Sequence, residues 1–321
     1  MRSHVTGVLC VLAAVLLWST VPVGTRLLVR DGMVFSPAFL SAARLWLAVL
    51  VFLILRAVHC HRAGIAFRVS IRHRGWLWIA AAAISANYLF YAIGLRYTTA
   101  GATSIISQVH SVATVLLAAS LLGERLTKQK VLGTVVAMIG VLLVVFQGNS
   151  LHDIFSSAHV VGNLIEVLAA LAWPFYAIGQ TKLVGEDGNR DVLMPIFVLS
   201  ALLSTLLLPV TGPFILHPPS NMDWAVLLFL GAGSTAAAYW LFAAGLQRMQ
   251  TSEGAMFNVL MPPLALLMAH WLLGESLRPS VLAGLALVVA GLVLIVWRRG
   301  HSPLRKRSTP LTDALRQQKN P

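Results

Sequence analysis

The chain has 321 residues, of which 58% are hydrophobic and 11% charged, with a mean hydropathy of +0.80 and a formal net charge of +13. Soluble globular domains carry about 25% charged residues, so this composition excludes a soluble protein and indicates an integral membrane protein. The bases lie mainly between and beyond the apolar runs, where membrane orientation explains them, so we predict no binding to nucleic acid. Cys10 in an apolar run and Cys60 in a basic loop imply no disulfide framework.

Ten apolar runs are each long enough to cross a bilayer, which takes about 20 helical residues. The first run continues through Trp18 and Pro22, beyond the short core of a cleaved signal peptide, so we expect an uncleaved helix. The fold class is therefore predicted to be an all-α integral membrane protein with ten transmembrane helices. The expected spans are 7–29, 35–57, 75–95, 101–122, 131–147, 159–181, 192–211, 222–247, 253–273 and 278–297.

One segment occurs twice: residues 88–145 fall on 239–296 without a gap when shifted by 151 positions. The matches are mostly Gly, Glu and Tyr, which membrane segments do not share by chance, so they indicate an internal duplication. They include Tyr88 with Tyr239, Gly94-Leu95 with Gly245-Leu246, Leu121-Leu122-Gly123-Glu124 with Leu272-Leu273-Gly274-Glu275, Gly133 with Gly284 and Gly140 with Gly291.

The duplication predicts a five-helix repeat over 1–147, a linker over 148–158, a second repeat over 159–297 and a basic cytoplasmic tail over 298–321. Because each repeat has an odd number of spans, the second must be inverted relative to the first. Nineteen of the 24 Lys and Arg residues fall on the side of the N-terminus and four on the other side. The excess predicts that both termini are cytoplasmic and that the protein is a multi-pass protein of the inner (plasma) membrane.

The two halves resemble the paired repeats of the drug/metabolite transporter superfamily, in its ten-helix EamA-like branch. The resemblance rests on 39–44 in the second span, on the Tyr-to-Gly-Leu segments at 88–95 and 239–246, and on the Leu-Leu-Gly-Glu turns followed by Gly133 and Gly284. It implies a secondary transporter of metabolites such as amino acids, nucleosides or sugar derivatives. The chain departs from the family at two positions. The proline that usually precedes the turn is kept as Pro262 in the second half but is replaced by Ser111 at the matching position of the first half, and the second half lacks a counterpart of Arg44.

Polar side chains line one face of the fourth predicted span. Ser104, Ser107, Gln108, Ser111 and Thr114 recur at steps of three and four, and His110 lies at the margin of that face. Polar groups in hydrocarbon need partners or water, so we expect this face to line a cavity. The alternative is a seam of small hydroxyl residues between packed helices.

Glu166 is the only acidic residue well inside a predicted span, and Arg44 is the only such base. An ionisable residue in a membrane indicates a functional site. Two interpretations stay open: Glu166 or His110 carries a coupling proton, or Glu166 forms a structural ion pair with Arg44. Both residues are expected at similar depth, since their helices start on the same side and rise about 1.5 Å per residue.

Aromatic residues lie away from the membrane interfaces where such rings usually anchor. A deep Tyr or Trp offers a large apolar face and one polar atom, which suits a cavity for a small organic solute. The alternative is ordinary packing. The predicted substrate-binding residues are Trp18, Tyr88, Tyr91, Gln108, His110, Trp173, Tyr176, Tyr239 and Asn258.

The sequence predicts a secondary transporter that moves small organic metabolites, with export favoured, by alternating access between the two halves. No Walker phosphate loop is present, and neither a cofactor nor a metal site is predicted, since His59-Cys60-His61 lacks a fourth ligand. The predicted partners are a small-molecule substrate and the lipid bilayer, and the oligomeric state stays open, with a monomer among the options. The alternatives are an intramembrane enzyme, for which no nucleophile motif is found, and a receptor or assembly factor.

Overall fold

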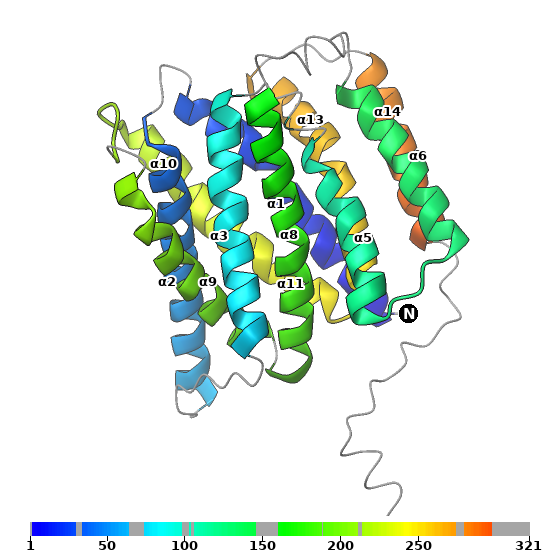
Figure 1. Cartoon of the computed structure of the whole chain (residues 1–321), viewed down its shortest axis with the longest axis horizontal. Coiled ribbons are helices and arrows are strands. Elements are labelled where there is room, and N and C mark those ends of the chain that lie inside the picture. Colours follow the sequence, from blue (N-terminus) through cyan, green and yellow to red (C-terminus); the bar gives the residue numbers. More distant parts are fainter. Residues whose placement is uncertain are drawn as a thin grey trace, which may run out of the picture.

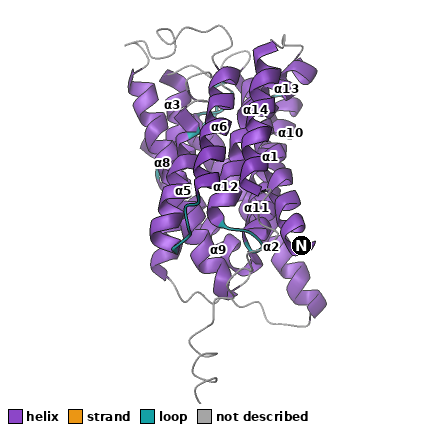
Figure 2. Cartoon of the chain, turned by 90° about the vertical axis from the view of Figure 1, so that its right-hand side faces the viewer, coloured by secondary structure: helices purple, strands orange, loops and turns teal. Residues whose placement is uncertain are grey.

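The computed structural model describes residues 2–29, 34–63, 74–97, 103, 106–145, 160–187, 189–210, 214–273 and 279–296. These residues are almost entirely helical (Figures 1 and 2), and their one β-bridge joins Phe35 to Ile215. The first half contains α1 (Arg2–Val29), α2 (Pro37–Ala63), α3 (Arg74–Tyr97), α5 (Val109–Leu122) and α6 (Lys128–Val145). The second contains α8 (Val160–Asp187), α9 (Asn189–Leu206), α10 (Asn221–Gly231), η3 (Ala232–Ala237), α11 (Ala238–Leu246), α12 (Thr251–Met256), η4 (Phe257–Leu260), α13 (Met261–Leu273) and α14 (Pro279–Val296).

Two of the ten predicted spans are built from joined pieces. The eighth runs from α10 through the π-helix η3 into α11, and the ninth runs from α12 through the 3-10 helix η4 into α13. In the described residues the prediction of ten helical segments is thus confirmed. Six of them are long and apolar enough to cross a membrane, and the fourth, seventh and tenth contain shorter apolar helices.

Two predictions about boundaries are corrected. The second helix extends to Ala63 rather than to residue 57, so Cys60 lies on α2 and is buried rather than in a loop. The seventh helix α9 ends at Leu206, before a short 3-10 turn at Leu208–Val210. The linker 148–158, the tail 298–321, Ser104 and Glu275 lie outside the described residues.

Large apolar side chains cover the outer surface of the helices. Trp78, Leu132, Leu164 and Leu228 are all exposed, as are many other Leu and Val residues. A soluble protein rarely exposes so much contiguous apolar surface. This surface matches a surrounding bilayer, in agreement with the composition.

The fifth and tenth helices show directly that the halves are inverted. A Cβ atom placed on Gly140 of α6 would lie 2.6 Å from the carbonyl oxygen of Gly284 on α14, and one placed on Gly291 would lie 2.5 Å from that of Gly133. Since Gly284 and Gly291 are the repeat counterparts of Gly133 and Gly140, the contacts are reciprocal and antiparallel. A two-fold axis perpendicular to these helices relates them, which is the symmetry of an inverted repeat.

The first helices of the two halves follow the same symmetry with a different shift. Trp18 and Gly24 of α1 match Trp173 and Gly179 of α8 when the shift is 155. With this shift Val11 corresponds to Glu166, and the contacts agree, because Gly245 of α11 packs on Val11 while Gly94 of α3 packs on Glu166. The second half therefore carries a buried acid where the first has valine.

Candidate functional site

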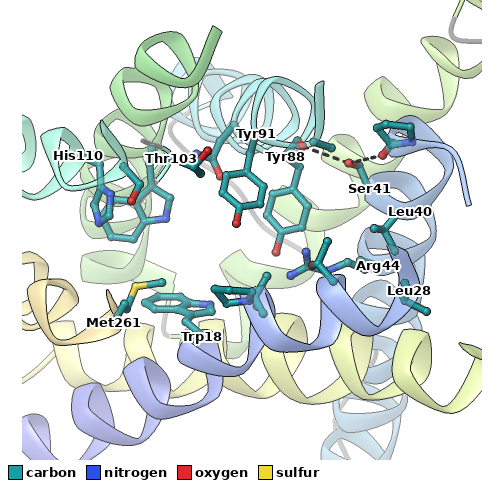
Figure 3. A pocket seen from close by; sticks show the side chains of 18 of the residues that line it. Trp18, Leu28, Leu40, Ser41, Arg44, Tyr88, Tyr91, Thr103, His110 and Met261 are labelled. Carbon is teal, nitrogen blue, oxygen red and sulfur yellow. Dashed lines mark hydrogen bonds between the residues drawn. The ribbon is translucent and has the colours of Figure 1, made fainter. Parts of the chain in front are cut away.

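A cavity of ≈ 460 Å³ lies in the middle of the helix bundle. Ligand pockets usually measure about 300–1,000 Å³, so this one is large enough for a single small solute. Figure 3 shows Tyr88 and Tyr91 of α3 pointing into it, with Trp18 of α1 and Arg44 of α2 across from them. The lining residues are Trp18, Val21, Pro22, Thr25, Leu28, Phe35, Pro37, Leu40, Ser41, Arg44, Asn87, Tyr88, Tyr91, Ala92, Thr103, Ser107, His110, Trp173, Tyr239, Asn258 and Met261.

Four pairs of lining residues are related by the repeat. With the shift of 151, Tyr88 corresponds to Tyr239, Ser107 to Asn258 and His110 to Met261, and with the shift of 155 Trp18 corresponds to Trp173. A cavity lined by both members of each pair lies on the two-fold axis between the halves. This is the place where inverted-repeat transporters bind substrate and coupling ion.

The aromatic residues form one connected cluster around the cavity. The ring of Trp18 lies 5.1 Å from that of Tyr239 and 6.1 Å from that of Trp173, and both contacts are edge-to-face. The His110 ring lies 5.0 Å from Trp173, and Tyr88 lies 6.5 Å from Tyr239. These geometries are favourable for aromatic pairs, so the rings hold each other in place.

Tyr176 and Gln108 are buried but do not line the cavity. Tyr176 has no exposed surface and packs its ring edge-on against Tyr239 at 5.1 Å, behind the cavity wall. Gln108 precedes α5 and is 1% exposed, with no hydrogen-bond partner for its Oε1. The structure therefore gives both residues a place behind the wall, and a direct contact with a solute would require a rearrangement.

Arg44 lines the cavity and is held by α3 and by the π-helix. Its Nη2 donates to Thr235 Oγ1 over 3.3 Å, and its Cζ lies 4.8 Å from the centre of the Tyr88 ring. Thr235 Oγ1 donates to the carbonyl oxygen of Leu230 at 2.8 Å, so the Tyr88 hydroxyl donates in the 3.2 Å contact with Thr235. π-Helical turns are rare and often mark functional sites.

Glu166 lies behind the cavity wall, separated from the cavity by Thr103. The Thr103 hydroxyl donates to Glu166 Oε1 over 3.4 Å, and Thr103 itself lines the cavity. The ion pair between Glu166 and Arg44, one of the two interpretations left open above, is not among the described contacts of Arg44, which are those to Thr235 and Tyr88. Glu166 on α8 and Arg44 on α2 were expected at similar depth in the membrane, but similar depth does not make two helices neighbours.

Asn258 interrupts the ninth helical segment at the cavity. It lies in the 3-10 helix η4, is 1% exposed, and neither its Oδ1 nor its Nδ2 has a hydrogen-bond partner. Buried side-chain amides normally have hydrogen-bond partners. The unpaired amide of Asn258 therefore indicates that a polar group of a bound solute or water forms hydrogen bonds with it in the cavity.

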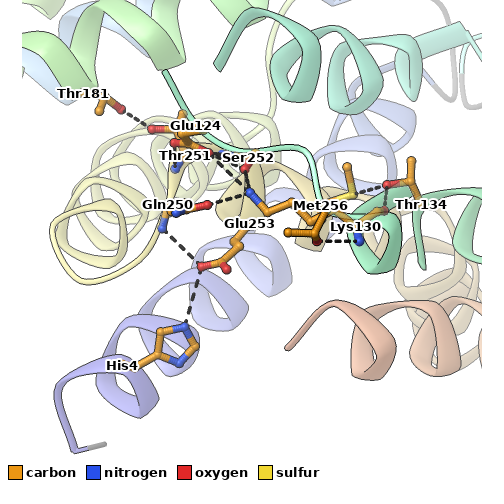
Figure 4. A network of polar contacts seen from close by, with 11 residues as sticks. His4, Glu124, Lys130, Thr134, Thr181, Gln250, Thr251, Ser252, Glu253 and Met256 are labelled. Atoms are coloured by element: carbon orange, nitrogen blue, oxygen red, sulfur yellow. Dashed lines mark hydrogen bonds and ion pairs between the residues drawn. The ribbon is translucent and has the colours of Figure 1, made fainter. Parts of the chain in front are cut away.

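A polar network lies at the end of the molecule nearest the N-terminus (Figure 4). Glu124, in the turn between α5 and α6, accepts hydrogen bonds from the backbone N–H groups of Thr251 (2.8 Å) and Ser252 (3.2 Å) and from the Ser252 hydroxyl. Lys130 Nζ lies 3.6 Å from Glu124 and donates to Gln250 at 2.6 Å. The carboxylate thus caps the N-terminus of α12 and ties it to the first half.

His4 of α1 joins the same network through Glu253. Its Nε2 lies 3.7 Å from Glu253 Oε2, and that oxygen also accepts from the backbone N–H of Gln250 at 3.2 Å. Polar contacts therefore connect three segments at this end: α1, α12, and the turn between α5 and α6.

Sequence reasoning missed several residues that shape the cavity. Ser41 donates to the carbonyl oxygens of Pro37 (2.8 Å) and Tyr88 (3.2 Å), and Asn87 donates to that of Ala169 (2.8 Å). Thr235 gave no signal because small hydroxyl residues are common in membrane helices. Met261 could have been found as the repeat counterpart of His110. Among the described residues no group of three or more His, Cys, Asp or Glu could hold a metal ion.

Comparison with known proteins agrees with this architecture. The chain is 31% identical to a probable amino-acid metabolite efflux pump of Salmonella typhimurium, over 65% of this chain and 71% of the relative. It is 27% identical to a protein of the same description from Escherichia coli, over 66% of this chain and 73% of the relative. A crystal structure with 20% sequence identity superposes with a TM-score of 0.77, covering 92% of this chain and 99% of that one, which shows a shared fold.

The family model of the EamA-like transporters matches residues 5–146 and again 160–297, one match in each half. Together the two matches cover most of the chain, including the residues on both sides of the cavity. The chain therefore belongs to the EamA-like transporter family.

Proposed function

We propose that this membrane transporter exports small organic metabolites, such as amino acids or related compounds, by alternating access through the central cavity. The observation that carries the proposal is the position of the cavity on the two-fold axis, lined by Tyr88 with Tyr239 and by three further repeat-related pairs. Inverted halves around a shared site can expose that site to either side in turn by exchanging conformations.

The arrangement described here fits the outward-facing state of that cycle. The cavity extends from Trp18 in the middle of α1 to Leu28 and Phe35 near the end of that helix and the start of α2. The Glu124 network lies at the opposite end, beside His4. With both termini cytoplasmic, as the distribution of bases indicates, the network closes the cytoplasmic side.

Glu166 is the proposed proton carrier. It is the membrane-embedded acid that lies beside the cavity, and Thr103 connects it to the lining through one hydrogen bond. His110 lines the cavity and is the second candidate. A proton taken up on one side and released on the other would couple export to the proton gradient of the inner membrane.

Flux measurements in reconstituted vesicles test the proposal. Purified protein in liposomes should move labelled metabolites faster than protein-free liposomes, and an imposed pH gradient should drive their accumulation. Sidedness is checked with Leu126→Cys and His217→Cys, which an impermeant thiol reagent should label from the cytoplasmic and the opposite face respectively. Absence of flux for a broad metabolite panel, with the protein correctly inserted, would rule out the transport function.

A further inference from the structure

Among the described residues that line the cavity, Arg44 is a positive charge with no acidic partner. Arg44 is 7% exposed and lines the cavity, and its Nε has no hydrogen-bond partner. None of the described lining residues is acidic, and Glu166 lies behind Thr103. Among the described residues, the guanidinium contacts only the Thr235 hydroxyl and the face of Tyr88.

A buried cation of this kind favours the binding of an anion. An unpaired charge in a low-dielectric site is unfavourable, and the protein relieves it when an oppositely charged group enters. The guanidinium is planar and presents five N–H groups that match the two oxygens of a carboxylate. Tyr88 and Thr235 hold its orientation from one side and leave its remaining N–H groups available.

The other lining residues indicate which further chemical groups a solute needs to fit the cavity. Trp18, Trp173 and Tyr239 present edge-to-face rings, which favour an apolar body. Asn258 offers an unpaired carbonyl oxygen and an unpaired amide nitrogen, which suit a neutral hydroxyl, keto or amide group. In the part of the lining that the structure describes, no carboxylate is available to receive an ammonium group.

We infer that the solute is a monocarboxylate whose carboxylate pairs with Arg44, whose apolar body lies against Trp18, Trp173 and Tyr239, and whose neutral polar group binds Asn258. The inference rests on the proposed transport function and specifies its substrate class. Acids with a hydroxyl, keto or acylamino group are preferred over zwitterionic amino acids of the same size, and amines without a carboxylate are rejected.

Binding of matched solutes to the purified wild-type protein tests this class without any mutation. Two series are compared, one with a benzyl and one with an isobutyl side chain, each containing the 2-hydroxy acid, the 2-oxo acid, the N-acetyl amino acid, the free amino acid and the amine. Quenching of tryptophan fluorescence reports binding, since Trp18 and Trp173 line the cavity. The acids should bind roughly 10- to 100-fold more tightly than the amino acid, because the ammonium group of the amino acid finds no carboxylate in the described lining. This range corresponds to the loss of hydrogen bonds to a charged group.

Variants of Arg44 test whether this residue causes the preference for acids over amino acids. Arg44→Gln should reduce the affinity for the acids to that for the amino acids, while Arg44→Lys should keep the preference with weaker binding. Arg56→Gln is the control, because Arg56 is a second buried arginine on α2 that does not line the cavity. If Arg44→Gln does not fold, the binding of the solute series to the wild-type protein and to Arg44→Lys still tests the inference.

The inference is overturned if an amine or a zwitterion binds as tightly as the matching acid, if no member of either series binds, or if Arg44→Gln keeps the preference. Flux assays separate this failure from failure of the transport proposal. Vesicles that transport solutes without regard to a carboxylate would leave the transport function standing and remove the substrate class. Vesicles that transport nothing would remove the transport function, while binding to the detergent-solubilised protein would still decide whether the site recognises acids.

Discussion

Gly140 of α6 packs against Gly284 of α14 so closely that a Cβ on Gly140 would lie 2.6 Å from the Gly284 carbonyl oxygen. The repeat-related contact between Gly291 and Gly133 is equally close. Small residues allow this approach of two backbones in membranes. The two contacts fix the fifth and tenth helices as an antiparallel pair, one from each half.

Gly140→Ala should therefore destabilise the protein. Overpacking of a tight contact costs about 1–3 kcal/mol, and here the neighbouring atom is backbone, which cannot move aside easily. The control is Gly75→Ala on α3, where the added Cβ meets no neighbouring side chain or segment within 4 Å. Thermal unfolding in detergent should show a lower midpoint for Gly140→Ala and an unchanged or higher one for Gly75→Ala. Equal midpoints would contradict the packing.

Tyr239→Ala should impair transport by more than any loss of its abundance in the membrane accounts for. The ring lines the cavity and touches Trp18 and Tyr88, so its removal enlarges the site and weakens solute binding. Phe52→Ala is the comparison, because Phe52 is buried against Phe197 and does not line the cavity. That variant should lose about 3–5 kcal/mol of stability, and the solute affinity of its folded fraction should be unchanged. Abundance of Tyr239→Ala falling in step with its activity would assign this ring to packing alone.

Glu166→Gln should fold normally, abolish proton-driven accumulation and spare exchange of solute across the membrane. The amide cannot titrate, and Arg44 does not depend on Glu166, since its described contacts are to Thr235 and Tyr88. Thr103→Val is the control: it removes the hydrogen bond to Glu166 and keeps the titratable group, so it should remain proton-coupled. Misfolding of Glu166→Gln that Arg44→Gln repairs would instead establish the ion pair.

Glu124→Gln should weaken the closure of the end nearest the N-terminus, which we propose to face the cytoplasm. The change removes the charge that caps α12 and pairs with Lys130, at a cost of about 0.5–2 kcal/mol. Asp223→Asn is the matched control, since Asp223 belongs to the capping box of α10 with Ser220, away from the network. A cysteine in the cavity should react faster from the side of the N-terminus in Glu124→Gln and at the wild-type rate in Asp223→Asn. An unchanged rate in both would show that the network is not part of the gate.

The architecture could be predicted because the duplication leaves a visible record in glycines and tyrosines. Gly133, Gly140 and their counterparts belong to this record, and they form the antiparallel contact of α6 with α14. Tyr88 and Tyr239 were paired by the shift of 151, and both line the cavity. The relationship of α1 to α8 was missed because its shift of 155 is carried by few residues, among them Trp18 and Trp173.

The arrangement within the membrane plane could not be predicted. Depth along the helix placed Glu166 and Arg44 in one layer but did not show which helices are neighbours, and Glu166 instead packs on Gly94. The role of Thr235 depends on the widened turn of the π-helix, which brings its hydroxyl to both Arg44 and Tyr88. A local widening of this kind has no periodic signature in the sequence.

Access to one residue of the cavity from both faces of the membrane tests the central claim most directly. Ala92 lines the cavity on α3, and Ala92→Cys, with Cys10 and Cys60 replaced by serine, places a single thiol there. Alternating access predicts that an impermeant reagent added to either face alone labels this thiol, and that bound solute slows both reactions. Labelling from one face only, under every condition of pH gradient and solute, would contradict transport through this cavity.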